Sequence, residues 1–388
     1  MEPFDKKPTV LSMFCGCGGL DLGFHESGYD VVWANDINED ACLTYEHNLG
    51  QVVRGNIEDL EIPVIKDLDI LLSGFPCQSF SNAGNRKGIY EKRGNLYKFT
   101  LKYIEVLRPK VVMMENVRGL LSTKTETGYL LPEIFQSLTK MNYEVHFKLV
   151  NAAHFGVPQN RLRVIIVALK KDAALGKFYF PEPITGLDLS IQNTIFDIPA
   201  DTPNQDEMLK LNPQALYLGD FVPEGGSWKD IPTEVLPDRL KKIRDNMEKY
   251  RWPNFYRRFH RDEIAGTITA AFKPENAGVW HPVEKRVFTT REIARIQSFP
   301  DDFEFKGRTI KANYEMIGNA VPPKLSYAFA RELRKVLVGE DIPKRGEVRL
   351  FSQIGFGSVP IRVNDPEVIY DYYEPIQEQL SFIKALGQ

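Results

Sequence analysis

The stretch VLSMFCGCGGLD, from Val10 to Asp21, decides the fold because it joins an apolar strand to a glycine-rich turn and then to a helix. Such a turn lets the backbone approach a nucleotide cofactor closely. Asp21 stands where the G-x-G-x-x-G pattern has its third glycine, which argues against a pyrophosphate cofactor. Asp36, roughly 20 residues further on, is placed to bind ribose hydroxyls. Many α/β proteins have a glycine turn for structural reasons alone, so the rest of the chain must support this interpretation.

Working outward, short apolar runs alternate with amphipathic helical stretches as far as residue 170. The alternation predicts an α/β fold with a doubly wound, mostly parallel sheet. The expected strands are residues 10–14, 31–34, 69–73, 111–115 and 164–169, and the expected helices are 19–27, 39–48, 95–107, 290–297 and 323–338. Between residues 171 and 285 this alternation stops and prolines become frequent, which predicts a second, smaller and irregular domain.

Composition narrows the class of protein. A chain of 388 residues exceeds the size of one growing core, so two domains are expected. No apolar run reaches the ~18 residues of a membrane span, so we expect a cytoplasmic protein with no membrane partner. Four cysteines are too few for a disulfide framework, and their spacing completes no metal site.

The net charge of −3 is a poor guide to nucleic-acid binding, because binding depends on how charge clusters. Residues 238–261 contain nine basic and three acidic residues, with aromatic residues interleaved. A solvated basic helix face explains this segment as well as a nucleic-acid surface does.

The segment SGFPCQSFS, residues 73–81, follows an apolar strand and therefore lies where α/β enzymes place their active sites. Glycine and proline would hold Cys77 still and exposed, as a nucleophile requires, although a small buried thiol is the common alternative. The next strand ends in Glu115, which would emerge at the same edge and could donate a proton. A nucleophile beside an acid forms a chemical pair.

These residues resemble the DNA (cytosine-5)-methyltransferases, in particular the bacterial restriction-modification type. Six motifs occur in the family's order: F-x-G-x-G-G at 14–19, P-C-Q at 76–78, E-N-V at 115–117, Q-x-R-x-R at 159–163, R-x-x-T-x-R-E-x-A-R-x-Q-x-F-P at 286–300 and G-N-A-V-P-P at 318–323. The resemblance implies methyl transfer from S-adenosylmethionine to carbon 5 of a cytosine flipped out of double-stranded DNA. It also implies protection of host DNA from a cognate restriction endonuclease.

The resemblance implies catalytic roles for Cys77, Gln78, Glu115, Asn116, Arg161 and Arg163. Cys77 would attack cytosine C6, while Glu115 and Arg163 would hold the N3 edge. Asn116 would fix the loop that carries Cys77, and Arg161 would help to orient the site.

The implied cofactor contacts are Phe14, Gly16, Gly18, Gly19, Leu20, Asp36, Ile37, Asn56, Ile57, Pro76, Leu96 and Asn319. Two positions depart from the family pattern. Asn56 replaces the aspartate that accepts from the adenine amino group, which should weaken affinity without abolishing it, because an amide oxygen also accepts. Ile37 replaces an aromatic residue and would give apolar contact without full stacking.

The resemblance also divides the chain into a catalytic and cofactor-binding domain (1–170), a target-recognition domain (171–285), a return segment that completes the catalytic domain (286–340) and an extension of unknown role (341–388). The implied DNA contacts are Ser81, Arg257, Arg258, Arg261 and Thr267. We expect a monomer that associates with the nucleoid when it is bound to DNA.

Three alternatives remain open. A nicotinamide-dependent oxidoreductase would leave Cys77 and Glu115 without a function. The same machinery could act on RNA, as a tRNA-methylating branch of the family does, although the long recognition region favours DNA. A catalytically inactive DNA-binding relative is disfavoured because Cys77, Glu115 and Arg163 are all present.

Overall fold

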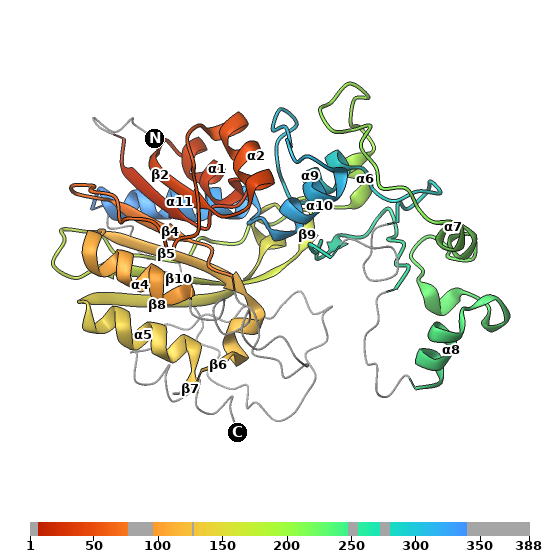
Figure 1. Ribbon diagram of the computed structural model, residues 1–388, viewed down its shortest axis with the longest axis horizontal. Coiled ribbons are helices and arrows are strands. Elements are labelled where there is room, and N and C mark those ends of the chain that lie inside the picture. The colour runs from red at the N-terminus through yellow and green to blue at the C-terminus, as the bar shows by residue number, and fades with distance from the viewer. Residues whose placement is uncertain (1–6, 77–95, 126–127, 247–254, 272–279, 340–388) are drawn as a thin grey trace.

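The computed structural model describes residues 7–76, 96–125, 128–246, 255–271 and 280–339 (Figure 1). A seven-stranded sheet in the order β3-β2-β1-β4-β5-β10-β8 forms its centre. β10 runs antiparallel to both of its neighbours, and the pairs from β3 to β5 are parallel. The strands are β1 (Thr9–Met13), β2 (Asp30–Asp36), β3 (Val53–Arg54), β4 (Ile70–Ser73), β5 (Val111–Val117), β8 (Tyr143–Asn151) and β10 (Leu162–Lys170).

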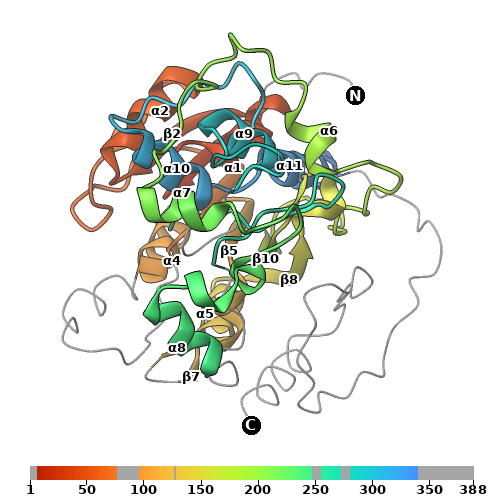
Figure 2. The same cartoon turned by 90° about the vertical axis from the view of Figure 1, so that its right-hand side faces the viewer.

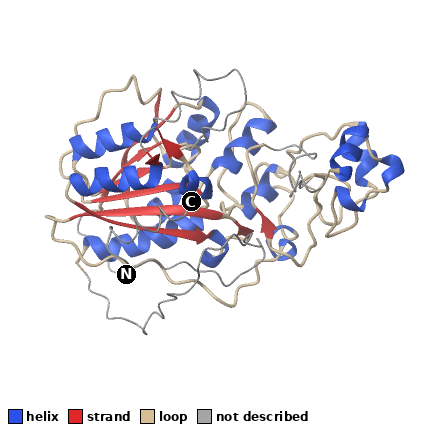
Figure 3. Cartoon of the chain, turned by 90° about the horizontal axis from the view of Figure 1, so that it is seen from below, coloured by secondary structure: helices blue, strands red, loops and turns tan. Residues whose placement is uncertain are grey.

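Helices cover both faces of this sheet, because the central strands carry apolar side chains on both of their faces. Helices α1 (Gly19–Glu26) and α11 (Pro323–Leu337) pack on the face that presents Val10, Ile70, Val111 and Ile165. Helices α4 (Leu96–Leu107) and α5 (Leu130–Lys140) pack on the face that presents Leu11, Leu71, Val112 and Ile166. Figure 3 shows the sheet from below, with helices on both sides. The predicted doubly wound, mostly parallel sheet is confirmed.

The helix α2 (Glu39–Leu49) packs beside β2 through Tyr45, which lies in a small cluster with Cys15 and Ala34. The structure adds β8 and α5, which the sequence analysis did not predict. The β8 strand alternates buried and partly exposed residues, as expected for a strand at the edge of the sheet. The α5 helix carries a proline in its first turn, where no backbone hydrogen bond is lost. A short hairpin of β6 (Lys124–Thr125) and β7 (Gly128–Tyr129) precedes α5.

After β10 the chain first packs on the sheet through Phe178 and Phe180. The described residues of 191–285 then form a group of short helices and loops, seen at the right of Figure 1 and facing the viewer in Figure 2. Its elements are α6 (Ile191–Ile195), α7 (Pro213–Gly219), the 3-10 turns Trp228–Asp230 and Thr233–Val235, α8 (Asp238–Asp245) and β11 (Ala265–Gly266). Trp228 and Trp280 are fully buried in its core. That core also includes residues of α9 (Thr290–Ile296) and α10 (Ile310–Asn319).

A two-stranded parallel sheet joins this group to the seven-stranded sheet, because β11 pairs with β9 (Gln159–Asn160), which immediately precedes β10. Within the part of the chain that the structure describes, no helix is long and apolar enough to cross a bilayer.

Candidate active site

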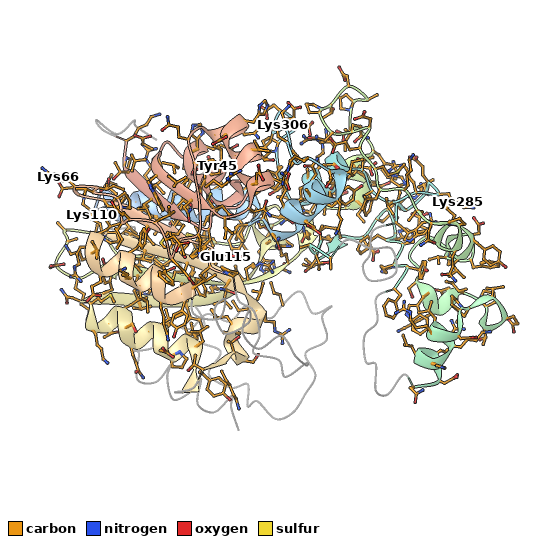
Figure 4. The ribbon with its side chains drawn as sticks, viewed as in Figure 1. Tyr45, Lys66, Lys110, Glu115, Lys285 and Lys306 are labelled. Atoms are coloured by element: carbon orange, nitrogen blue, oxygen red, sulfur yellow. The ribbon has the colours of Figure 1, made fainter. Side chains whose placement is uncertain are left out.

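The carboxyl ends of β1, β4 and β5 meet at one edge of the sheet. Met13 pairs with Ser73, and Ser73 pairs with Met114, so the next residues of the three strands are Phe14, Gly74 and Glu115. The glycine turn, the start of the 73–81 loop and the predicted acid therefore come together at this edge. Figure 4 shows Glu115 at the end of the sheet nearest to α9 and α10.

Glu115 forms a buried ion pair with Arg163 of the neighbouring antiparallel strand. The distance from Arg163 Nε to Glu115 Oε1 is 2.7 Å, and each side chain is 10% exposed. Strand register explains the contact, because Glu115 lies opposite Ile165 and therefore diagonally to Arg163 on the same face. The pair therefore presents a fixed carboxylate and guanidinium that are largely shielded from solvent.

Asn116 holds the backbone that leads into the loop. Its Nδ2 donates to the carbonyl oxygen of Phe75 at 2.8 Å, and its Oδ1 accepts from the backbone N–H of Val117 at 2.8 Å. Phe75 is buried, whereas Pro76 is exposed. The predicted residues Cys77, Gln78 and Ser81 lie outside the described residues. Asn116 thus fixes the loop two residues before Cys77.

The glycine turn is organised around Asp36 at the end of β2. Asp36 Oδ2 accepts from the backbone N–H of Gly16 at 2.8 Å, and Oδ1 accepts from that of Asn38 at 2.8 Å. Burial raises the pKa of Asp36, while the backbone donors oppose the rise. Each carboxylate oxygen keeps a second lone pair that could accept from a ribose hydroxyl. Phe14 has a φ of +56°, an uncommon backbone conformation for a bulky residue, which marks this turn as constrained.

The predicted cofactor residues divide into a group at or near the surface and a group that faces the interior. Ile37, Asn319 and Pro76 are exposed, and Gly16 has open space where a Cβ would be, so all four border accessible volume. Phe14, Asn56 and Leu96 are partly buried. The second group faces the protein interior. Leu20 and Ile57 are buried in hydrophobic clusters. The two glycines have no room for a side chain. A Cβ on Gly18 would lie 2.3 Å from Leu49, and a Cβ on Gly19 would lie 2.3 Å from the Val321 carbonyl oxygen.

Asp21 has a structural role that the sequence analysis missed. The side chain is fully buried and accepts from Ser12 Oγ at 2.6 Å and from Tyr45 Oη at 2.7 Å. Burial raises its pKa to about 6, although the two hydroxyl donors oppose the rise. Asp21 therefore joins β1, α1 and α2 beneath the glycine turn, and the departure from the G-x-G-x-x-G pattern reflects packing.

Arg161 and Gln159 are both buried, at 1% and 0% exposure. Arg161 donates to the carbonyl oxygens of Gly318 and Ala320, which flank Asn319. Gln159 contacts the side chain of Gln297. The sequence analysis gave no role to either glutamine, although both lie in motifs that it recognised. No group of three or more His, Cys, Asp or Glu side chains among the described residues could hold a metal ion.

The predicted DNA contacts differ in how far they are exposed. Arg258 is only 7% exposed, stacks over Trp280 at 5.3 Å and donates to the carbonyl oxygens of His281 and Glu284 at 2.9 and 3.1 Å. Its guanidinium therefore stabilises the core around Trp280 and is not available to a phosphate in this arrangement, which argues against the prediction that Arg258 contacts DNA.

The other predicted contacts lie nearer the surface. Arg257 pairs with Glu263, and Arg261 makes a bidentate pair with Glu224 at 2.8 and 2.9 Å. The Arg261 guanidinium lowers the pKa of Glu224 to about 2. Thr267 is exposed and its Oγ1 donates to the Asn160 carbonyl oxygen at 2.8 Å.

Comparisons with known proteins agree with this geometry. The family model of the C-5 cytosine-specific DNA methylases matches residues 9–335. The Type II methyltransferase M.NgoFVII of Neisseria gonorrhoeae is 41% identical over 84% of this chain and 86% of its own length. The Type II methyltransferase M.Eco47II of Escherichia coli is 34% identical over 85% of this chain and 79% of its own.

Among solved structures, DNMT2 of Spodoptera frugiperda has a similar fold, with a TM-score of 0.60 at 21% identity over 84% of this chain and 100% of its own. The family match covers most of the chain and includes every motif at the sheet edge. The chain therefore belongs to the C-5 cytosine-specific DNA methylases and is a DNA (cytosine-5)-methyltransferase.

Proposed function

We propose that this enzyme transfers a methyl group from S-adenosylmethionine to a cytosine that is flipped out of a specific DNA duplex, through a covalent bond between Cys77 and C6. The observation that carries the proposal is the buried Glu115–Arg163 pair, placed beside the loop that leads to Cys77. A stacked base cannot reach this edge of the sheet, so the target must leave the duplex.

The chemistry requires a nucleophile because cytosine C5 reacts poorly with a methyl sulfonium. The Cys77 thiolate would add to C6, and the electron pair then available at C5 would take the methyl group. Glu115 would protonate or hydrogen-bond N3 as charge develops there, while Arg163 keeps Glu115 in position. A base then removes the C5 proton, the S–C6 bond breaks and the thiolate is restored. Asn116 would hold the loop in place through both steps.

The residues at the glycine turn suit an adenosyl group. Asp36 retains lone pairs for ribose hydroxyls, and Gly16 has open space where a side chain would stand. Ile37 is an apolar side chain that is 68% exposed at the end of β2, where it could cover one face of the adenine. Asn56 could accept from the adenine amino group through its side-chain oxygen. When bound here, S-adenosylmethionine would supply the electrophilic methyl group.

Residues 171–285 would then recognise the target, with 286–340 returning to the catalytic domain. Helix α8 supports this role, because it buries Leu240 and Ile243 and leaves Arg239 and Lys242 exposed on its outer side. Exposed cations of this kind bind phosphates. The relatives named above are Type II methyltransferases, which supports a role in protecting host DNA from a cognate restriction endonuclease.

The test is to express the chain in a bacterial host that lacks cytosine methylation and to sequence its DNA after bisulfite conversion. We expect protected cytosines within one short motif, and none with Cys77→Ala. Cys42→Ala is the matched control, since this thiol lies in α2 and is assigned no role, and it should protect the same motif. Unprotected DNA in the presence of folded wild-type protein would refute the proposal. Bisulfite sequencing of RNA from the same cells would then test the RNA alternative.

A further inference from the structure

A closed set of buried hydrogen bonds joins four segments of the chain that are separated in the sequence. We call it the arginine clamp, and it consists of the side chains of Arg161, Gln159 and Gln297 with the backbone of Ile268, Gly318 and Ala320. Arg161 donates to the carbonyl oxygens of Ile268 and Gly318 at 2.8 Å and of Ala320 at 3.0 Å. One guanidinium thus holds the recognition segment and the turn after α10 together.

The two glutamines repeat these connections. Gln159 Oε1 accepts from the backbone N–H of Ile268 at 3.0 Å, and its Nε2 donates to the side chain of Gln297. Gln297 in turn donates to the Ala320 carbonyl oxygen at 2.6 Å. Both glutamines are 0% exposed. Ile268 and Ala320 are therefore each held by two side chains, and water does not compete for the bonds.

Backbone contact makes the junction rigid. A Cβ on Gly318 would lie 2.4 Å from both the Ala270 nitrogen and the Thr269 carbonyl carbon. Only glycine allows the two backbones to approach so closely. The segment 268–270 therefore cannot shift against the turn 318–320 without breaking several buried contacts at once.

An exposed residue lies next to the clamp on each side. Thr267 precedes Ile268 and is a predicted DNA contact, and Asn319 lies between Gly318 and Ala320 and is a predicted cofactor contact. Arg163, two residues after Arg161, holds Glu115. The clamp thus connects the DNA side, the cofactor side and the reacting edge.

We propose that Arg161 is a positioning residue that couples the binding of DNA at Thr267 to the binding of cofactor at Asn319. The proposal rests on the function proposed above. Arg161 Nε has no hydrogen-bond partner among the described residues, so a shift that released one of its carbonyl partners would leave the buried cation still less satisfied. The arrangement is therefore all-or-none. A ligand that stabilises it from one side lowers the cost of binding at the other, and the effect must be reciprocal.

The full-length protein allows a direct test. The dissociation constant of S-adenosylhomocysteine, which cannot donate a methyl group, is measured by calorimetry with and without a duplex that carries the mapped target motif. Wild-type protein should bind it about 10-fold more tightly with the duplex, within the usual range for coupled sites. Arg161→Lys keeps the charge but cannot reach three carbonyls, so the ratio should fall close to 1. The readout is the ratio of the two dissociation constants, because a change in cofactor affinity that is the same with and without DNA leaves this ratio unchanged.

Arg163→Lys is the matched control, since it makes the same change two residues away. It should lose methyl transfer and keep the coupling ratio. Gln297→Leu removes one connection to Ala320 and should lower the ratio in part, which keeps the test decisive if Arg161→Lys does not fold. An active wild-type enzyme without coupling, or a folded Arg161→Lys variant that retains the wild-type coupling ratio, would overturn the proposal. Failure of the proposed function has a different signature, because wild-type protein would then bind no S-adenosylhomocysteine, and the coupling proposal would fall with it.

Discussion

Replacing Asp21 by asparagine should change how the stability of the protein depends on pH. Asp21 is fully buried, and its only polar partners among the contacts described above are the hydroxyls of Ser12 and Tyr45. Burial raises its pKa from 3.8 to about 6 in the folded state. Since one pKa unit corresponds to about 1.4 kcal/mol, ionised Asp21 costs the folded state about 3 kcal/mol relative to the protonated form.

The direction follows from proton binding. Between pH 4 and pH 6 the folded state binds more protons at this carboxyl than the unfolded state does, so its favourable contribution is complete below about pH 4 and is lost as the pH rises through about 6. The asparagine side chain of the variant carries no charge at any pH. The free energy of unfolding of Asp21→Asn minus that of wild type should therefore rise with pH, by about 1.4 kcal/mol between pH 5 and pH 8.

Urea titrations followed by tryptophan fluorescence at fixed pH values measure this difference. The part of this free-energy difference that changes with pH reports the charge of Asp21, whereas a part that is constant with pH reports the altered hydrogen bonds. Tyr45→Phe is an informative companion, because it removes a donor that favours the ionised form and should move the transition to higher pH. A difference between Asp21→Asn and wild type that stays flat from pH 5 to pH 8 would refute the reasoning.

Four further substitutions test the site and the proposed recognition region. Glu115→Gln keeps the shape but removes the proton donor, so methyl transfer should slow by about 10²–10⁴-fold while DNA binding in gel-shift assays stays intact; an unchanged rate would exclude this role. Asn116→Ala removes the hydrogen bond to Phe75 and leaves a buried carbonyl unsatisfied, at a cost of about 1–3 kcal/mol. Single-turnover methylation should therefore slow, while binding of S-adenosylhomocysteine should not change. Weaker binding with normal turnover would contradict this. Arg258→Ala should lower the melting temperature without changing the salt dependence of DNA binding. Lys242→Ala should instead reduce the slope of log Kd against log salt by about 1. A reduced slope for Arg258→Ala and an unchanged slope for Lys242→Ala would identify Arg258 as the phosphate contact.

Much of the fold could be predicted because its strands are nearly continuous apolar runs with clear ends. The expected strands and those of the sheet centre agree to within one or two residues, as the runs at 111–115 and 164–169 illustrate. The edge strand β8 was not predicted because an edge strand is only partly buried and its residues alternate in polarity. Proline at position 132 likewise obscured α5, although a proline in the first turn of a helix costs nothing.

The site shows where local sequence stops being informative. The predicted contact between the Glu115 strand and the loop strand required that the two strands be neighbours, and β4 does pair with β5. The direction of an arginine side chain has no such local signal. Arg257 and Arg258 are adjacent, yet one is partly exposed and the other lies against Trp280, which is 22 residues further along the chain and outside any local pattern. Figure 4 shows Lys285 in this outer part beside α7, far from Glu115.

The single antiparallel strand explains why these motifs can form one active site. In a wholly parallel sheet, the residues at the start of a strand lie at the edge opposite to the carboxyl ends, and Arg161 and Arg163 would be about a strand length away from Glu115. Because β10 runs against β5, its first residues lie opposite Val117 at the carboxyl edge. The reversal therefore brings the two arginines to the acid and lets the β9–β11 pair attach the recognition region at the same point.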